Sequence, residues 1–385
     1  MPHGLTITES ATGARSILAP SLSVIGIIAT ATAAAGQATT DLDAAFPLNV
    51  PVLVTDVDTA SGNAGTGGTL KSALEAIGDQ TSPIVVVVRV AVDADQADQD
   101  ANVIGATTGN SYTGIQALLA AESVVGVRPR IIAAPGLDTQ AVTAELVVAA
   151  KKLRAMVYAA AIGDDVAEVV LYRDNFGDRE LMLIWPDTST TIPGDAIARA
   201  VGLRALIDEE QGWNKTISNV TIGGVTEISK HVHFDLLDTS TDAGVLNDAQ
   251  VTTLIRNTGY RFWGNRTCAG EDQPEFAFES AVRTSHALQD VIVSVFLPFF
   301  DRPMTVAMVK DLLETCNAAM RQLKAQGRIV GALAYFDKTK NSAEQLAAGR
   351  PTIGIKYTPT APMENPIVEL INTAEFYEGF ADQLV

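Results

Sequence analysis

Cysteine is scarce in this chain. Its 385 residues include two cysteines, Cys268 and Cys316, which lie in different predicted elements. A disulfide framework is excluded, and a zinc site built from several thiolates is close to excluded. We expect the fold to depend on its hydrophobic interior, which a composition with 47% hydrophobic residues can fill.

Positive charge is also scarce. The chain has 45 acidic residues against 27 lysines and arginines, which gives a formal net charge of −18. A surface that binds nucleic acid or an anionic membrane needs clustered lysine and arginine to neutralise phosphate groups. The charge balance argues against both kinds of surface and favours protein partners.

Long apolar runs are missing too. The most apolar stretches, such as 24–35 and 84–88, fall short of the ~20 residues that span a bilayer. The first residues, MPHGLTITESATGAR, lack the basic start and apolar core of a signal peptide. We expect synthesis and retention in the cytoplasm, without insertion into a membrane.

β-Prone and helical stretches alternate over most of the chain. Repeated β–α units predict an α/β fold with a mostly parallel sheet and helices on both sides. Strands are expected at 24–31, 50–55, 83–92, 130–134, 156–161 and 180–185, and helices at about 69–77, 113–121, 138–153, 165–175 and 191–212. The alternation stops over 213–250, so a domain boundary is expected between about 240 and 258.

The C-terminal third is organised differently. Helices are expected at 277–299 and 305–327, and strands at 328–336 and 352–358, which the short helical sequence NSAEQLAAG joins. Three prolines make the following TPTAPMENP a stiff extended linker. It leads to IVELIN at 367–372, a β-prone segment with no partner in view.

The missing partners of these strands are the main physical clue. Two strands alone form a marginal sheet in water, and folded proteins cover unpaired strand edges. Two β-prone segments, GLTITE at 4–9 and IVELIN at 367–372, lie at opposite ends of the chain on spacers. They can complete the sheets of neighbouring copies. Terminal strands also often fold back onto their own domain, and the residue pattern alone leaves both arrangements open.

No motif for catalysis or cofactor binding is complete. The sequence SGNAGTGGTLKSA at 61–73 follows a strand and opens a helix, but Leu70 breaks the GxxxxGK[ST] spacing. A flexible loop with Thr69 as helix N-cap is preferred, and an α/β nucleotide-binding enzyme with a degenerate P-loop is the alternative. His231 and His233 alternate on an expected strand without further metal ligands, and Ser111 misses the GxSxG spacing. We assign no catalytic, cofactor or metal residues.

The helix expected at 305–327 has an apolar arc beside a basic stripe. At ~100° per residue, Lys310, Asn317, Arg321 and Lys324 share one face. The surrounding residues, 301–340, carry a net charge of +3 within an acidic chain. This asymmetry indicates an acidic protein partner, and an ordinary solvated face is the alternative.

One stretch gathers bulky side chains in a chain that is only 6% aromatic, namely NTGYRFWGNRT at 257–267. Together with HGLTITES near the N-terminus, NSAEQLAAG before a strand, and PMENP before a strand, it resembles contractile tail sheath proteins. The likeness is to sheaths of R-type pyocins and of myophages with short sheath subunits. It is strongest over 3–30 and 250–372, and between 90 and 240 it rests on the α/β rhythm and on matches such as LRALIDEE.

The resemblance implies a structural subunit and not an enzyme. Six subunits form a ring, rings stack around an inner tube, and the stack contracts to drive the tube through a target envelope. The expected partners are copies of the chain itself, the inner tube protein, and baseplate and terminator proteins. The protein would be made in the bacterial cytoplasm and belong to a phage tail or a released tail-like particle, and no cofactor is required.

The resemblance also implies four regions: an N-terminal arm (1–20), an outer α/β domain (21–250), an inner α+β domain (251–363) and a C-terminal arm (364–385). The arms would donate strands that link subunits, which favours donation over folding back. The linking residues would be Leu5, Thr6, Ile7, Thr8, Ile367, Val368, Glu369, Leu370 and Ile371.

Two further sets of residues receive roles from the resemblance. Lys310, Arg321 and Lys324 would face an acidic tube wall. The motif around 260 would be framework, with Tyr260, Phe262 and Trp263 locking the inner-domain core and Arg261 and Arg266 fixing strand ends or a neighbouring chain.

Overall fold

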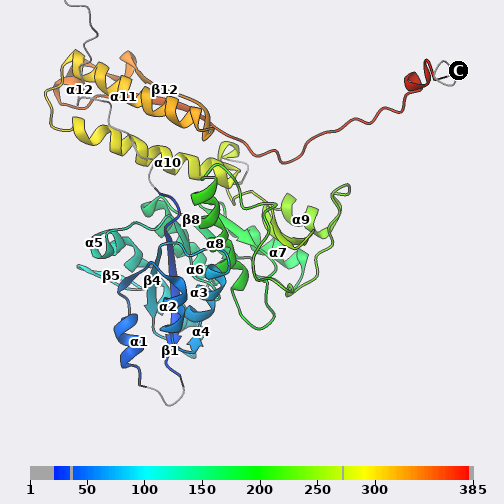
Figure 1. Ribbon diagram of the computed structural model, residues 1–385. Coiled ribbons are helices and arrows are strands. Elements are labelled where there is room, and N and C mark those ends of the chain that lie inside the picture. Colours follow the sequence, from blue (N-terminus) through cyan, green and yellow to red (C-terminus); the bar gives the residue numbers. More distant parts are fainter. Residues whose placement is uncertain (1–20, 35–37, 271–272, 381–385) are drawn as a thin grey trace, which may run out of the picture.

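The computed structural model describes residues 21–34, 38–270 and 273–380. Figure 1 shows a large unit built on a broad sheet, and a smaller unit of long helices and strands beside it. We call the elements from β1 to β11 the large unit, and those from α10 to β13 the small unit.

The sheet of the large unit has nine strands, in the order β11–β10–β9–β8–β7–β1–β4–β2, with β3 beside β1. Neighbouring strands from β10 to β4 run parallel, whereas β11 and β2 form antiparallel edges. This arrangement confirms the predicted α/β fold with a mostly parallel sheet. The strands are β1 (Ile25–Thr32), β2 (Pro51–Val54), β3 (Gly67–Gly68), β4 (Val85–Val90), β7 (Ile131–Ala133), β8 (Met156–Ala160), β9 (Leu181–Ile184), β10 (Val251–Arg256) and β11 (Tyr260–Trp263).

Helices cover both faces of this sheet. Ile25 and Ile27 of β1 pack into one core with α3 and α8, and Ile28 packs into a second core with α6. All residues of β4 are buried, as expected for a β-branched strand between two helical layers. The helices are α1 (Thr40–Ala45), α2 (Val57–Gly62), α3 (Leu70–Gly78), α4 (Gln96–Ile104), η1 (Gly114–Ala120), α5 (Ala121–Val125), α6 (Gln140–Leu153), α7 (Val166–Arg173), α8 (Asp195–Glu210) and α9 (Asp242–Asp248); a small hairpin, β5 (Thr107–Thr108) and β6 (Ser111–Tyr112), lies between α4 and η1.

Helix α10 joins the two units. Val282 near its start packs into the core of the large unit, and Ala287 and Leu288 further along belong to the core of the small unit. The Thr305 hydroxyl accepts a hydrogen bond from the Met308 N–H and caps the start of α11. The helix ends just before Gly327, whose backbone has a φ of 71°. The elements are η2 (Pro274–Phe276), α10 (Glu279–Phe296), η3 (Leu297–Phe299), α11 (Val306–Ala325), β12 (Ile329–Phe336), η4 (Lys338–Lys340), α12 (Ala343–Ala347), β13 (Ile353–Pro359) and η5 (Glu375–Tyr377).

The sheet continues across the stretch where the sequence placed a boundary, 240–258. β10 pairs with β9, and β11 pairs with β10. The first strands of the expected inner domain therefore belong to the large unit, because their hydrogen-bonding partners lie there. The expected helix at 113–121 is mostly a 3₁₀ turn, and 231–233 is irregular instead of a strand. None of the helices in the described ranges has the length and apolar character to cross a membrane.

Candidate assembly interface

The sheet of the small unit is incomplete. β12 and β13 pair antiparallel from Phe336–Ile353 to Ile329–Pro359. Neither strand has a second partner among the residues that the structure describes. Ala334 and Ile355 pack against the helices, whereas Leu333 is 55% exposed on the opposite face. Because a two-stranded sheet is marginal by itself, its free edges are natural sites for another strand.

The C-terminal segment after β13 carries exposed apolar residues. Figure 1 shows it leaving the small unit and extending away from both units. Ile367 is 95% exposed and Leu370 is 93% exposed, with Val368 and Ile371 also mostly exposed. The strand expected at 367–372 is not formed here, because nothing in the described chain supplies a hydrogen-bonding partner. Residues 367–372, which include Glu369, are therefore β-prone in sequence but do not belong to a sheet in this structure.

Two described residues near the ends of the chain, Leu22 and Glu364, are held close to α10. Arg266 forms an ion pair with Glu364 at 2.6 Å, which holds the root of the C-terminal segment. At the other end Leu22 is buried in the core of the small unit, and its carbonyl accepts from Arg283. The expected N-terminal linking residues, Leu5, Thr6, Ile7 and Thr8, lie outside the described residues.

The expected basic stripe of α11 is real but narrower than predicted. Lys310, Arg321 and Lys324 are exposed, and Arg321 pairs with Glu314 at 2.6 Å. Asn317 does not belong to this exposed face. Its Nδ2 donates to the Ala334 carbonyl at 3.1 Å, and its Oδ1 accepts from the Ala334 N–H at 2.8 Å. The asparagine therefore fastens β12 to α11, which helical periodicity alone cannot reveal.

The aromatic motif around 260 stabilises the large unit. Phe262 is fully buried in the core of the large sheet, which corrects its predicted place in an inner-domain core. Trp263 packs edge-on against Phe234 with ring centroids 5.1 Å apart, and Tyr260 is half-buried. Arg261 Nη1 donates to the carbonyl and side-chain oxygens of Asn219, at 3.0 and 3.2 Å. The motif forms the edge strand β11 of the large sheet and contacts the loop residues that pack beside it.

A buried charge network fastens the small unit to the large one. We call Tyr158, Arg204, Asp208, Glu279 and Arg283 the Arg204 cluster. Arg204 bonds Asp208 at 2.9 Å and Glu279 at 3.3 Å, and Arg283 pairs with Asp208. The Tyr158 hydroxyl donates to Glu279 at 2.6 Å, and burial together with that carboxylate raises the pKa of Tyr158. α8, β8 and α10 are thus joined at one point.

The Arg204 cluster was not found from the sequence. A usable signal was present, because Arg204 and Asp208, and likewise Glu279 and Arg283, are four residues apart on helices. Such pairs are usually solvated. Only tertiary packing reveals that these side chains are almost fully buried.

The glycine-rich stretch at 61–73 is packed against protein backbone. Gly67 and Gly68 pair with Thr32 and Ala31 of β1. A Cβ atom on Gly65 would lie 2.2 Å from the Thr32 carbonyl oxygen, so the glycines permit close approach of β1. Thr69 precedes α3, but its hydroxyl accepts from the Thr30 N–H at 3.2 Å instead of capping the helix.

Other candidate groups are dispersed. His231 and His233 are exposed on irregular chain. Cys268 and Cys316 are buried and separate, and burial raises the pKa of the Cys268 thiol to about 12. Within the described ranges, no group of three or more histidine, cysteine, aspartate or glutamate side chains is arranged to hold a metal ion.

Comparisons with known proteins agree on one family. Family models for the phage tail sheath protein central domain and for the tail sheath protein Gp18 domain III N-terminal region match residues 110–268 and 23–90. The tail sheath protein of Escherichia phage P2 is 46% identical, over 94% of this chain and 93% of the relative. The major tail sheath protein of Serratia phage KSP20 is 40% identical, over 98% and 96%.

A solved structure extends the likeness to the fold. A chain of the anti-feeding prophage helical sheath, in the contracted state, matches with a TM-score of 0.68 and 17% sequence identity. The match covers 96% of this chain and 99% of that chain. At this identity the likeness concerns the arrangement of the elements.

Proposed function

Because this chain belongs to the phage tail sheath protein family, we propose that six copies form a ring and that rings stack around an inner tube. The chain is a structural protein of a contractile tail sheath. Its place in a virion tail or a released tail-like particle follows from that role, as do contacts with the tube, baseplate and terminator proteins. Synthesis in the bacterial cytoplasm remains a prediction.

Strand donation is the link that we propose between copies. One observation carries it: the β12–β13 sheet has free edges, and the exposed segment 367–371 has no sheet. Pairing the two would satisfy backbone groups on both sides and bury the apolar side chains. In an extended segment, Val368 and Leu370 share one face and Ile367 and Ile371 share the other, so both faces can pack.

The N-terminal residues 5–8 are the second proposed donor. Leu22, at the root of that segment, is anchored in the small unit, so both donors start near the sheet that they would extend in other copies. Three chains would then contribute to one sheet. This proposal rests on the family resemblance for residues 5–8.

Contraction is proposed to release energy stored during assembly. New contacts between outer, large units would form, while the donated strands stay paired so that rings cannot separate. No nucleotide is needed, and we propose no enzymatic activity for the loop at 61–73. ATP binding by the full-length chain in a calorimetric titration would contradict this point.

Truncation tests the strand links. Deleting residues 1–12 or 365–385 is expected to abolish tubular assembly in electron micrographs, while far-UV circular dichroism shows that the units stay folded. Normal sheaths from either truncated chain would disprove the corresponding link.

A point variant gives a sharper test of the same proposal. Val368→Pro removes a backbone N–H from the proposed ladder and should prevent assembly. Ala361→Pro, in the proline-rich linker, is the matched control and should still assemble. Equal assembly of both variants would count against pairing through 367–371.

A further inference from the structure

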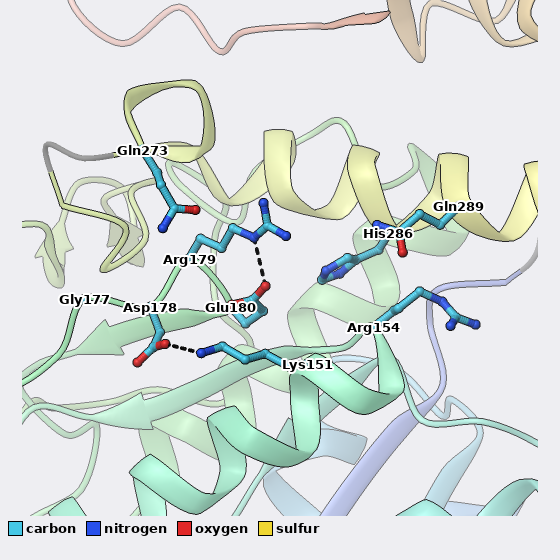
Figure 2. A pocket seen from close by; sticks show the side chains of 9 residues that line it. All are labelled: Lys151, Arg154, Gly177, Asp178, Arg179, Glu180, Gln273, His286 and Gln289. Carbon is cyan, nitrogen blue, oxygen red and sulfur yellow. Dashed lines mark hydrogen bonds and ion pairs between the residues drawn. The ribbon is translucent and has the colours of Figure 1, made fainter. Parts of the chain in front are cut away.

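A polar hollow lies where α10 meets the large unit. Figure 2 shows it between the end of α6, the loop before β9, and one side of α10. Its volume is about 360 Å³, which is enough for a side-chain head group. The lining residues are Lys151, Arg154, Gly177, Asp178, Arg179, Glu180, Gln273, His286 and Gln289.

Positive charge exceeds negative charge in this hollow. Lys151 pairs with Asp178 at 2.5 Å, and Arg179 Nε bonds Glu180 at 2.9 Å. Arg154 pairs with Asp290 at 3.1 Å, but the same carboxylate also serves the buried Arg130. One carboxylate therefore faces two guanidinium groups, and the site keeps an excess cation in a chain whose net charge is −18.

Arg179 has N–H groups that are not hydrogen-bonded within the described residues. Within the described residues, its only hydrogen bond runs from Nε to Glu180. Its guanidinium lies over the Phe276 ring, with Cζ 4.2 Å from the centroid, which fixes its plane. Figure 2 shows the two terminal nitrogens turned away from Glu180. A planar fork that is held in place is suited to an acceptor with two oxygens.

His286 is the second unusual group. It is only 5% exposed, and Figure 2 shows its ring projecting from α10 into the hollow, toward Arg179 and Glu180. No hydrogen bond to either ring nitrogen is formed by the described part of the chain. Burial first, and the nearby Arg283 and Arg179 next, lower the pKa of His286 to about 3. The ring is therefore neutral and offers one N–H donor.

We propose that this hollow binds a carboxylate, and that the carboxylate belongs to an acidic side chain of a second copy of this chain. The Arg179 fork and the His286 N–H would donate to its oxygens. The site would be separate from the strand links, because it is formed by α6, the loop before β9, and α10, and not by β12 or β13. The identity of the occupant as a second copy rests on the proposed assembly.

Calorimetric titration of the full-length chain with glutarate, which mimics a glutamate side chain, tests the site. Saturable binding is expected over a sodium chloride blank of equal ionic strength. Arg179→Gln should weaken it at least about tenfold, because a charged hydrogen-bonding partner is lost. Arg128→Gln, which removes a half-buried arginine paired with Glu122 and outside the hollow, should leave it unchanged. Absence of saturable binding, or equal binding by Arg179→Gln, would overturn the proposal.

A second variant covers the case in which Arg179→Gln disturbs folding. His286→Leu removes the imidazole donor and keeps a side chain of similar size. Glutarate binding should weaken severalfold, with circular dichroism unchanged. Unchanged affinity in a folded His286→Leu chain would exclude the histidine as a ligand.

The source of the carboxylate is tested separately during assembly. Glutarate should slow sheath formation more than sodium chloride of equal ionic strength, and Arg179→Gln should shorten the sheaths. If glutarate binds but neither treatment changes assembly, the second copy is not the occupant. Failure of strand donation would show itself differently, as normal assembly by Val368→Pro, and would leave glutarate binding intact.

Discussion

The sheet of the large unit and the sheet of the small unit are built from similar strands in opposite situations. β4 has strands on both sides and every residue buried, whereas β12 pairs with one strand of the described chain and includes exposed residues such as Val330 and Leu333. In a strand between two others the backbone N–H and C=O groups are paired on both sides. A strand at the edge of a sheet has a row of unpaired N–H and C=O groups on its free side. The comparison teaches that the large unit pairs its inner strands within the chain, whereas the small unit keeps the free strand edges through which we propose that copies join.

The largest effect is expected from breaking the Arg204 cluster. Arg204→Met would leave Glu279 and Asp208 with less compensating charge where water cannot reach them. We expect unfolding to become easier by about 3–5 kcal/mol, measured by urea denaturation. Arg321→Met, at an exposed pair with Glu314, should change it by less than about 1 kcal/mol. Similar losses in both variants would show that the cluster does not join the units.

A pH experiment probes the large unit alone. Burial raises the pKa of Asp138 to about 6, above its ordinary value, so its contribution to stability is present below about pH 4 and is lost as pH rises through about 6. Asp138→Asn imitates the protonated form. Between pH 4 and 7, the stability of the variant should gain about 2–3 kcal/mol relative to the parent chain.

Asp56→Asn is the control for the sign of that effect. Hydrogen bonds from Thr59 lower the pKa of Asp56, so the variant should lose relative stability as pH rises. A parallel pH dependence of the two variants would contradict the assignment to Asp138.

Loosening the small unit is expected to have a moderate and local effect. Asn317→Ala removes both side-chain bonds to Ala334, at a cost of about 1–3 kcal/mol. Hydrogen exchange measured by mass spectrometry should speed up over 329–336 and stay unchanged over 85–90. Gln322→Ala, at an exposed site of the same helix, should change neither. Faster exchange over 85–90 would mean that the two units open together.

The smallest effect on folding is expected on the basic surface of α11. Replacing Lys310 and Lys324 by alanine should change stability by about 0.5 kcal/mol or less, because both side chains are exposed. We propose that this surface faces the inner tube, so cosedimentation with the inner tube protein should fall severalfold and depend strongly on salt. Lys71→Ala, in the large unit, should bind like the parent chain. Unchanged cosedimentation of the double variant would remove these residues from the tube interface.

Much of the large unit could be predicted, because its strands and helices have characteristic residue patterns within each segment. The β-branched run ending at Val90 and the helical stretch before Glu210 both lie within their expected ranges. The place of β10 and β11 could not be predicted, because strand pairing depends on residues far away in the chain. Phe262 lies in the core of the large unit and not in the expected inner-domain core for the same reason.

The interface residues show a second limit. Ile367–Ile371 have the composition of a strand, yet the isolated chain leaves them unpaired. Sequence pattern describes what a segment can form, and the presence of a partner decides whether it does. The contact of Asn317 with β12 and the position of the His286 ring in the hollow likewise could not be predicted from the sequence. Each is set by an element that is distant in the chain.

The fastening of Leu22 and Glu364 near α10 has a mechanical consequence. If copies are tethered through their ends, tension along the sheath passes from Glu364 to Arg266, through α10, and out again at Leu22. The Arg204 cluster fixes the broad sheet to this path at α10. In our proposal each subunit therefore turns about its tethers as one rigid body, so a sheath can shorten without unfolding the subunits that it consists of.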